Sequence, residues 1–211
     1  MKINLINGSQ KTGESNSGII LDNLNELIKN KHEVKIHISG TKLFSEEVFK
    51  EIISGDVIVL AFSLFGDSIP SHTLKMLIEL ENTIKQEKTN NLIMYAIVNN
   101  GFYEGKQNHI AIEMIKNWCE RSGLKFGGGI GQGAGEMIGH TKKYPINKGP
   151  FNNLGRALQK MAENIEQGKS MEIMYLSPYF PRFLWKFMAT RYWHSLSSKN
   201  GIRKKDIKKR L

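Results

Sequence analysis

The 211-residue chain has little of what builds disulfide-linked, metal-binding or membrane-spanning proteins. Its one cysteine, Cys119, excludes a disulfide framework or a multi-cysteine metal site within one chain, and favours a reducing compartment, the cytoplasm. The six histidines have neither HxH nor HxxxH spacing, so we expect no metal site. No run reaches the roughly 18–20 apolar residues that span a bilayer, and the opening MKINLING is typical of a strand rather than of a signal peptide.

The positive charge is unevenly distributed. The net charge is +10, but the segment from Arg182 to the end holds ten Lys/Arg and one acid, Asp206. Residues 1–181 hold 20 basic and 19 acidic residues and are close to neutral. The basic run is short and no groove-reading motif accompanies it, so we do not expect nucleic-acid binding.

Strand-like and helix-like segments alternate along the chain. Apolar spacing at i, i+3, i+4 and i+7 predicts helices between the strands, as in the segment that contains Cys119. This order predicts an α/β fold: a doubly wound, five-stranded parallel sheet with helices on both faces. We expect this domain to cover residues 1–170, followed by an aromatic and basic helical extension over residues 171–211. The five predicted strands cover residues 2–6, 34–38, 56–62, 91–98 and 124–131.

Three loops are candidates for a binding site, because ligands of such sheets lie beyond the carboxyl ends of the strands. The first loop, INGSQKTGESNS, leads into a predicted helix. It fails the P-loop signature GxxxxGK[ST], since Glu14 stands where lysine is required. A hydroxyl-rich loop at a helix N-terminus favours a phosphate monoester, with charge from Lys11. On this loop alone, a capped helix after a polar turn is the alternative. Its candidate donors are Ser9, Thr12, Ser15 and Ser17.

The loops after the third and fourth predicted strands read SLFGDSIPS and NNGFYE. With these loops the chain resembles the flavodoxin-like NAD(P)H-dependent FMN reductases, whose three loops are similar to GSxxxxSNS, PLYxDSxPS and NxGFxE. The resemblance covers roughly residues 1–167, and the glycine-rich GGGIGQGAGEMI is also similar to the family. Ser63 and Phe65 depart from it, because the family commonly has proline and tyrosine there.

The resemblance implies a flavodoxin-like fold and an FMN-dependent NAD(P)H oxidoreductase, which passes reducing equivalents through bound FMN to a small-molecule electron acceptor. The flavin would carry the chemistry, so no catalytic side chain is expected. A homodimer is also implied. The alternative is a flavodoxin-like electron carrier or flavin-binding protein without nicotinamide activity. The cofactor-binding residues implied are Ser9, Lys11, Thr12, Ser15, Asn16, Ser17, Ser63, Leu64, Phe65, Gly66, Asp67, Asn99, Asn100, Gly101, Phe102 and Glu104.

Other chemistries have weaker support in the sequence. Cys119 lies on the apolar stripe of a predicted helix, which indicates a core residue rather than a nucleophile. Ser63, Asp67 and His72 could be drawn as a hydrolase triad, but no GxSxG elbow surrounds Ser63. The stretch 129–134 mimics the dinucleotide pattern GxGxxA, yet no periodic helix follows at once.

The aromatic and basic extension has two interpretations. It packs on the domain or on a partner subunit, or it rests on a membrane surface with Trp185 and Trp193 at headgroup depth. A third class of function follows from the second interpretation: an adaptor that works through this tail.

Overall fold

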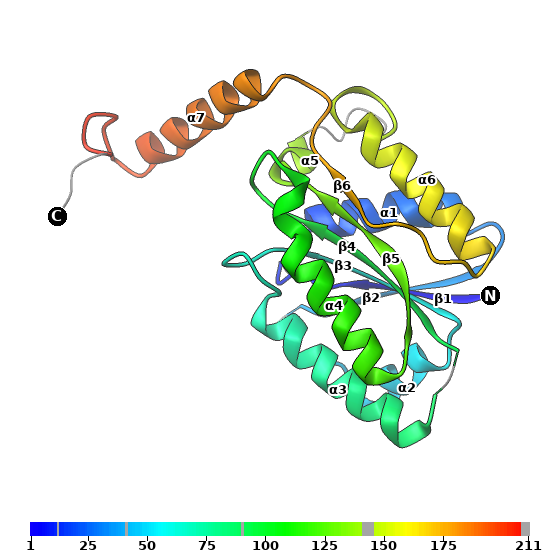
Figure 1. The fold of residues 1–211 in the computed structure, drawn as a ribbon. Helices are drawn as coiled ribbons and strands as arrows, with labels where there is room; N and C mark the ends of the chain where they lie inside the picture. Colours follow the sequence, from blue (N-terminus) through cyan, green and yellow to red (C-terminus); the bar gives the residue numbers. More distant parts are fainter. Residues whose placement is uncertain (12, 41, 90, 141–145, 208–211) are drawn as a thin grey trace. The chain divides into compact units, whose positions relative to one another are not determined.

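The computed structural model describes residues 1–11, 13–40, 42–89, 91–140 and 146–207. By compactness the chain divides into two units, Met1–Pro178 and Tyr179–Leu211. The first unit holds a six-stranded sheet and its covering helices, and the second holds the helix α7 (Arg182–Lys199) (Figure 1).

All strand pairs of the sheet are parallel, and the strand order is β2-β1-β3-β4-β5-β6. β2 lies at one edge, as the alternation of VKIHI predicts for an exposed strand. Because the strands run in one direction, all their carboxyl ends lie along the same side of the sheet, across the strands rather than beside an outermost strand. The strands are β1 (Lys2–Asn7), β2 (Glu33–Ile38), β3 (Val57–Ser63), β4 (Ile93–Asn99), β5 (Lys125–Gln132) and β6 (Met174–Leu176).

The prediction of five strands is wrong by one. The sixth strand, β6, lies in the segment predicted as the extension and pairs with β5 from Ile130↔Met174 to Gln132↔Leu176. It has three residues, all half-buried, so it is too short for an alternating pattern to identify.

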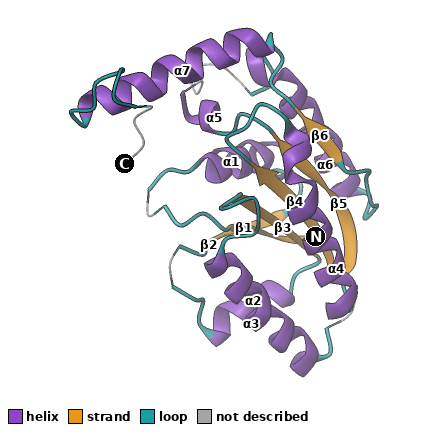
Figure 2. Ribbon diagram, turned by 60° about the vertical axis from the view of Figure 1, so that its left-hand side comes forward, coloured by secondary structure: helices purple, strands orange, loops and turns teal. Residues whose placement is uncertain are grey.

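Helices cover both faces of the sheet (Figure 2). One face carries α1, α5 and α6, and the other carries α2, α3 and α4. Local signals fix several helix ends: the Ser15 side chain caps α1, and Gly123, at φ 75°, ends α4 in the left-handed region. The bounds are α1 (Asn16–Ile28), α2 (Glu46–Ile53), α3 (Ser71–Glu87), α4 (His109–Ser122), α5 (Glu136–His140) and α6 (Asn152–Glu166), with 3-10 turns η1 (Gly105–Asn108) and η2 (Gly149–Phe151).

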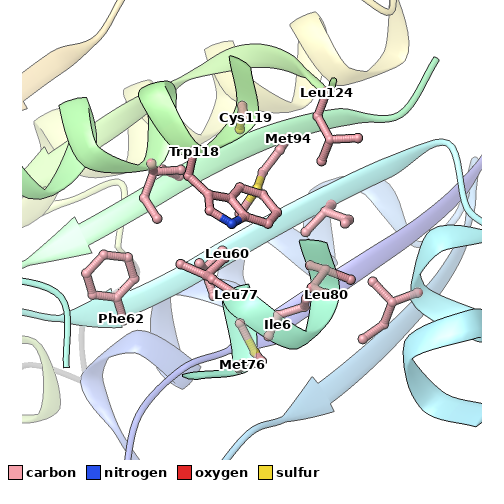
Figure 3. Close-up of a cluster of buried hydrophobic side chains, with 14 of the residues drawn as sticks. Ile6, Leu60, Phe62, Met76, Leu77, Leu80, Met94, Trp118, Cys119 and Leu124 are labelled. Carbon is pink, nitrogen blue, oxygen red and sulfur yellow. The ribbon is translucent and has the colours of Figure 1, made fainter. Parts of the chain in front are cut away.

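Alternate residues of the central strands fill two separate cores. In β3, Leu60 and Phe62 face the core under α2, α3 and α4, whereas Val59 and Ala61 face the core under α1 and α6. Both faces are buried, which explains why the sequence of this strand is a continuous apolar run. In the first of these cores, Trp118 from α4 and Leu77 from α3 close around the β3 side chains (Figure 3).

The pairing of β4 with β5 contains a bulge at Gly127. The register passes from Met94↔Phe126 to Tyr95↔Gly128, which leaves Gly127 as the extra residue. A Cβ on Gly127 would lie 2.7 Å from the buried ring of Tyr95, and Gly128 has φ 109°, with Met171 O 2.2 Å from the position of a Cβ. The glycine run therefore lets the Tyr95 ring and the chain at Met171 pack against the sheet.

No helix among the described residues has both the length and the apolar character needed to cross a bilayer.

Gly128→Ala should destabilise the protein by roughly 3 kcal/mol or more, because alanine is strained at this φ and its methyl group would overlap Met171 O. Urea denaturation measures the loss. Gly13→Ala is the matched control, since a Cβ there meets nothing within 4 Å. Equal stabilities for the two variants would contradict the packing described for β5.

Candidate functional site

Three loops leave the carboxyl ends of three adjacent strands, β1, β3 and β4. We define loop 1 as residues 8–15, loop 2 as residues 64–70 and loop 3 as residues 100–104. β3 lies between β1 and β4, so the three loops start side by side at one edge of the sheet. This is the arrangement that the sequence predicts for a binding site.

A closed ring of hydrogen bonds joins the bases of these loops. Asn99 Nδ2 donates to Ser17 Oγ at 3.0 Å, and Ser63 Oγ donates to Asn99 Oδ1 at 2.8 Å. The Ser17 and Ser63 hydroxyls lie 3.4 Å apart and close the ring. Asn99 Nδ2 also donates to Phe62 O, which fixes the orientation of the amide. Ser17 and Asn99 are buried, so the bond between them is shielded from water, whereas Ser63 is half-buried.

Loop 1 is built around the buried side chain of Asn7. Asn7 Oδ1 accepts from the backbone N–H of Ser9 at 3.1 Å, and Asn7 Nδ2 donates to Ser15 Oγ at 3.1 Å. Ser15 Oγ in turn accepts from the N–H of Gly18 at 3.0 Å, as the N-cap of α1. The hydroxyl-rich loop and the family resemblance predict Ser15 as a phosphate ligand, and the structure places its side chain in the cap of the helix.

The other predicted residues of the first loop lie nearer the surface. The N–H of exposed Lys11 donates to Ser9 Oγ at 3.3 Å. Asn16 Oδ1 accepts from Gly139 N at 3.1 Å and so connects the start of α1 to α5. Thr12, also predicted here, lies outside the described residues.

Two residues of α3 that the sequence did not single out for this role support loop 1. His72 Nε2 lies 2.8 Å from Gly8 O, and Thr73 Oγ1 donates to the same oxygen at 3.0 Å. A Cβ on Gly8 would lie 3.2 Å from Thr73 Oγ1, so a glycine lets the two segments approach. The α3 contacts with Gly8 connect residues far apart in the sequence, so no local sequence motif could predict them. The same holds for the choice of Asn7 as the residue around which loop 1 folds.

Loop 2 presents an aromatic side chain on a tight turn. Phe65 and Ser68 form an isolated β-bridge, and between them Gly66 and Asp67 have φ 57° and 61°. Two successive positive φ values suit glycine and aspartate, and they turn the chain sharply. Phe65 is 75% exposed, whereas Leu64 is half-buried and packs against the core.

Loop 3 is stabilised by Asn100. The N–H of Phe102 donates to Asn100 Oδ1 at 2.8 Å, and Asn100 Nδ2 donates to Glu104 O at 3.2 Å. Phe102 is 51% exposed, and a Cβ on exposed Gly101 would lie 3.4 Å from Glu136 Oε1. The predicted role of Asn99 and Asn100 as amide donors to a ligand stays a prediction, since in the structure both side chains bond to the protein itself.

The first turn of α1 is suited to an anion. It contains no acidic residue, so no helix carboxylate offsets the positive end of the helix dipole. The helix has 13 residues, and loop 1 places the Lys11 side chain in solvent just before it. Exposed Glu14 opposes an anion at this place, so a ligand with few charges is favoured over a triphosphate.

The glycine-rich stretch at the end of β5 has a packing role. A Cβ on Gly131 would lie 2.8 Å from the Tyr175 ring, and one on Gly133 would lie 2.2 Å from Tyr103 O. A Cβ on Gly135 would lie 2.5 Å from Asn99 Oδ1. A Cβ on Gly129, the first glycine of the GxGxxA pattern, would lie 2.9 Å from Ala96 O, so close packing explains both glycines of the pattern without a dinucleotide.

The alternative chemistries gain no support from the geometry. Cys119 is fully buried and burial raises the pKa of its thiol to about 12, which confirms it as a core residue. Ser63 donates to Asn99 and His72 contacts Gly8 O, an arrangement different from a hydrolase triad. Among the described residues, no group of three or more His, Cys, Asp or Glu could hold a metal ion.

Comparison with known proteins identifies the fold. No family model and no curated protein matches the sequence. A NADPH-quinone reductase from P. pentosaceus is 15% identical, with a TM-score of 0.58 over 77% of this chain and 98% of that one. A short-chain flavodoxin associated with a bacterial microcompartment is 14% identical, with a TM-score of 0.54 over 81% and 99%. The fold is flavodoxin-like.

A larger protein contains the same fold as one part. Rubredoxin:oxygen oxidoreductase from Desulfovibrio gigas is 13% identical, with a TM-score of 0.53 over 79% of this chain. This chain spans 35% of that enzyme. At such identities these structures share the fold of this chain.

Asn99→Asp should destabilise the protein by roughly 2–3 kcal/mol, because an oxygen replaces the donor that faces Phe62 O and Ser17 Oγ in a buried position. The free energy of unfolding in urea, with circular dichroism as the signal, measures this loss. Gln167→Glu, the same change on an exposed side chain, should alter it by less than about 0.5 kcal/mol. If Asn99→Asp leaves the free energy of unfolding unchanged, the ring of hydrogen bonds does not hold the loops.

Proposed function

We propose that the chain is an FMN-dependent NAD(P)H oxidoreductase that passes reducing equivalents to a small-molecule acceptor. One observation carries this proposal: the Ser17–Ser63–Asn99 ring fixes the three loops that resemble the FMN reductases at one edge of a flavodoxin-like sheet. The fold neighbours include a NADPH-quinone reductase and a flavodoxin, which supports a flavin-related oxidoreductase or electron carrier.

The residues of the site fit a flavin mononucleotide in two parts. The phosphate would lie at loop 1, where the dipole of α1, the Ser9 hydroxyl and the Lys11 ammonium favour an anion. The isoalloxazine ring of the flavin would lie against Phe65 and Phe102, whose exposed side chains on loops 2 and 3 offer apolar surface. Bound FMN would supply the hydride and electron chemistry of the reaction.

Several polar side chains of the loops would act by holding the loops in position rather than by contact with a substrate. Ser15, Asn99 and Asn100 hold the loops through bonds to the protein, so donors to the flavin would come from the backbone of loops 1 and 3. Fixed backbone donors need no reorganisation when charge develops on a bound ring. The cytoplasmic location and the homodimer remain part of this proposal.

Phosphate recognition by loop 1 predicts that FMN binds about 100-fold more tightly than riboflavin, since two charge-assisted hydrogen bonds are worth roughly 3 kcal/mol or more. Quenching of flavin fluorescence measures both dissociation constants. Lys11→Ala should weaken FMN binding and leave riboflavin binding unchanged.

The same assay distinguishes contacts with the isoalloxazine ring from contacts with the phosphate, because riboflavin has the ring but no phosphate. Phe65→Ala and Phe102→Ala should weaken FMN and riboflavin by the same factor, about two- to tenfold each. Ile78→Ala, on an exposed apolar residue of α3, is the control and should leave both constants unchanged. Equal affinity for FMN and riboflavin, or no binding at micromolar flavin, would contradict the proposal.

Nicotinamide activity distinguishes the enzyme from a flavin-bearing electron carrier. We expect NADH or NADPH, mixed anaerobically with the FMN-loaded protein in a stopped-flow instrument, to bleach the flavin absorbance within seconds. A protein that binds FMN but is not reduced on the scale of minutes would be a carrier, which the flavodoxin neighbour represents.

A further inference from the structure

The second compact unit exposes large apolar side chains around its helix. No residue of α7 is buried among its 18 residues, and Phe183 and Trp193 are 76% and 58% exposed. Isolated exposed apolar residues are common, but a continuous series along one helix marks a surface that binds something. The series comprises Phe183, Leu184, Phe187, Met188, Tyr192 and Trp193.

The same unit is almost free of negative charge. Its described part, residues 179–207, contains seven Lys/Arg and a single acid, Asp206. Arg203 Nε donates to Asp206 Oδ2 at 2.8 Å, so this carboxylate is neutralised within the segment. The charge of the unit therefore selects an anionic partner.

We propose that this segment binds the surface of an anionic lipid membrane. Arg182, Lys186 and Thr190 form a polar stripe at i, i+4 and i+8, with apolar residues on both flanks. Arg191 lies among these apolar side chains, with its guanidinium 5.7 Å from the centre of the Phe187 ring. Phe183 and Phe187 lie on one flank, with Leu184 and Met188 further round the helix. Apolar side chains therefore project from more sides of α7 than the one face that a protein groove covers, and the long Arg and Lys side chains between them can extend to lipid headgroups.

Further details of α7 suit the lipid interface. Thr190 Oγ1 donates to Lys186 O at 2.7 Å and Ser197 Oγ donates to Trp193 O at 2.9 Å, so these hydroxyls are satisfied within the helix. Trp193 has an apolar ring with a polar N–H, the combination found at headgroup depth. The 18 residues include four Lys/Arg, so the helix would lie in the interface plane rather than cross the bilayer. This proposal does not rest on flavin binding.

Vesicle co-sedimentation of the full chain tests the proposal. We expect binding to phosphatidylcholine vesicles that contain phosphatidylglycerol, little binding to pure phosphatidylcholine, and loss of binding at high salt. Lys204→Ala with Lys205→Ala should weaken binding by about fivefold for each residue removed. Phe183→Ala with Phe187→Ala should weaken it by about tenfold or more.

Matched control variants on the first unit distinguish binding through α7 and the basic segment after it from nonspecific vesicle binding. Lys75→Ala with Lys160→Ala, and Leu74→Ala with Ile78→Ala, remove the same types of exposed side chain and should leave vesicle binding unchanged. Thermal unfolding of each variant should match that of the unaltered chain, so that a loss of binding reports the surface and not the fold.

Three results would overturn the proposal. The first is absence of binding to anionic vesicles, and the second is binding that the α7 variants and the controls reduce equally. The third is an α7-dependent dimer in sedimentation velocity without vesicle binding, which would assign the apolar surface to a second copy of the chain.

Discussion

The Asn99 amide is the group on which the candidate site depends. It accepts from Ser63, at the end of β3, and donates to Ser17, in the first turn of α1. One buried side chain therefore connects the carboxyl ends of β3 and β4 to the helix that follows β1. Each member of this ring has a partner inside the protein, which keeps a polar cluster stable where the sheet ends. The loops above the ring begin from fixed positions, although their tips carry exposed side chains such as Phe65.

Glycines around the ring of hydrogen bonds explain why the segments at the carboxyl ends of the strands pack so closely. A Cβ at Gly135 would overlap Asn99 Oδ1, and one at Gly8 would press on Thr73 Oγ1. Glycines thus bring neighbouring segments close enough for the polar contacts to form. Loop 1 also contacts His72 in the first turn of α3, the helix that follows loop 2. A ligand that contacts all three loops would meet a largely preformed surface, which lowers the entropic cost of binding.

Much of the fold follows from the sequence because the central strands are buried on both faces and are therefore continuously apolar. The three-residue β6 was missed because so short a strand carries no period. The loops were identified correctly as neighbours at one sheet edge, but the roles of individual side chains were harder to predict. Ser15 and Asn99 have residue types that bind ligands, yet their bonds are to Gly18, Asn7 and Ser17, contacts that only the tertiary structure defines. Asn7 was not singled out because a polar residue at a strand end has many possible roles.

The central claim is that three loops, distant in sequence, form one flavin site. Backbone amide chemical shifts of the ¹⁵N-labelled protein, followed during an FMN titration, test this claim residue by residue. The account predicts that amides of loops 1, 2 and 3 shift together and saturate with one dissociation constant, while amides of α2 and α6 stay in place. Shifts confined to one loop, shifts centred elsewhere, or no shifts at millimolar FMN would contradict it.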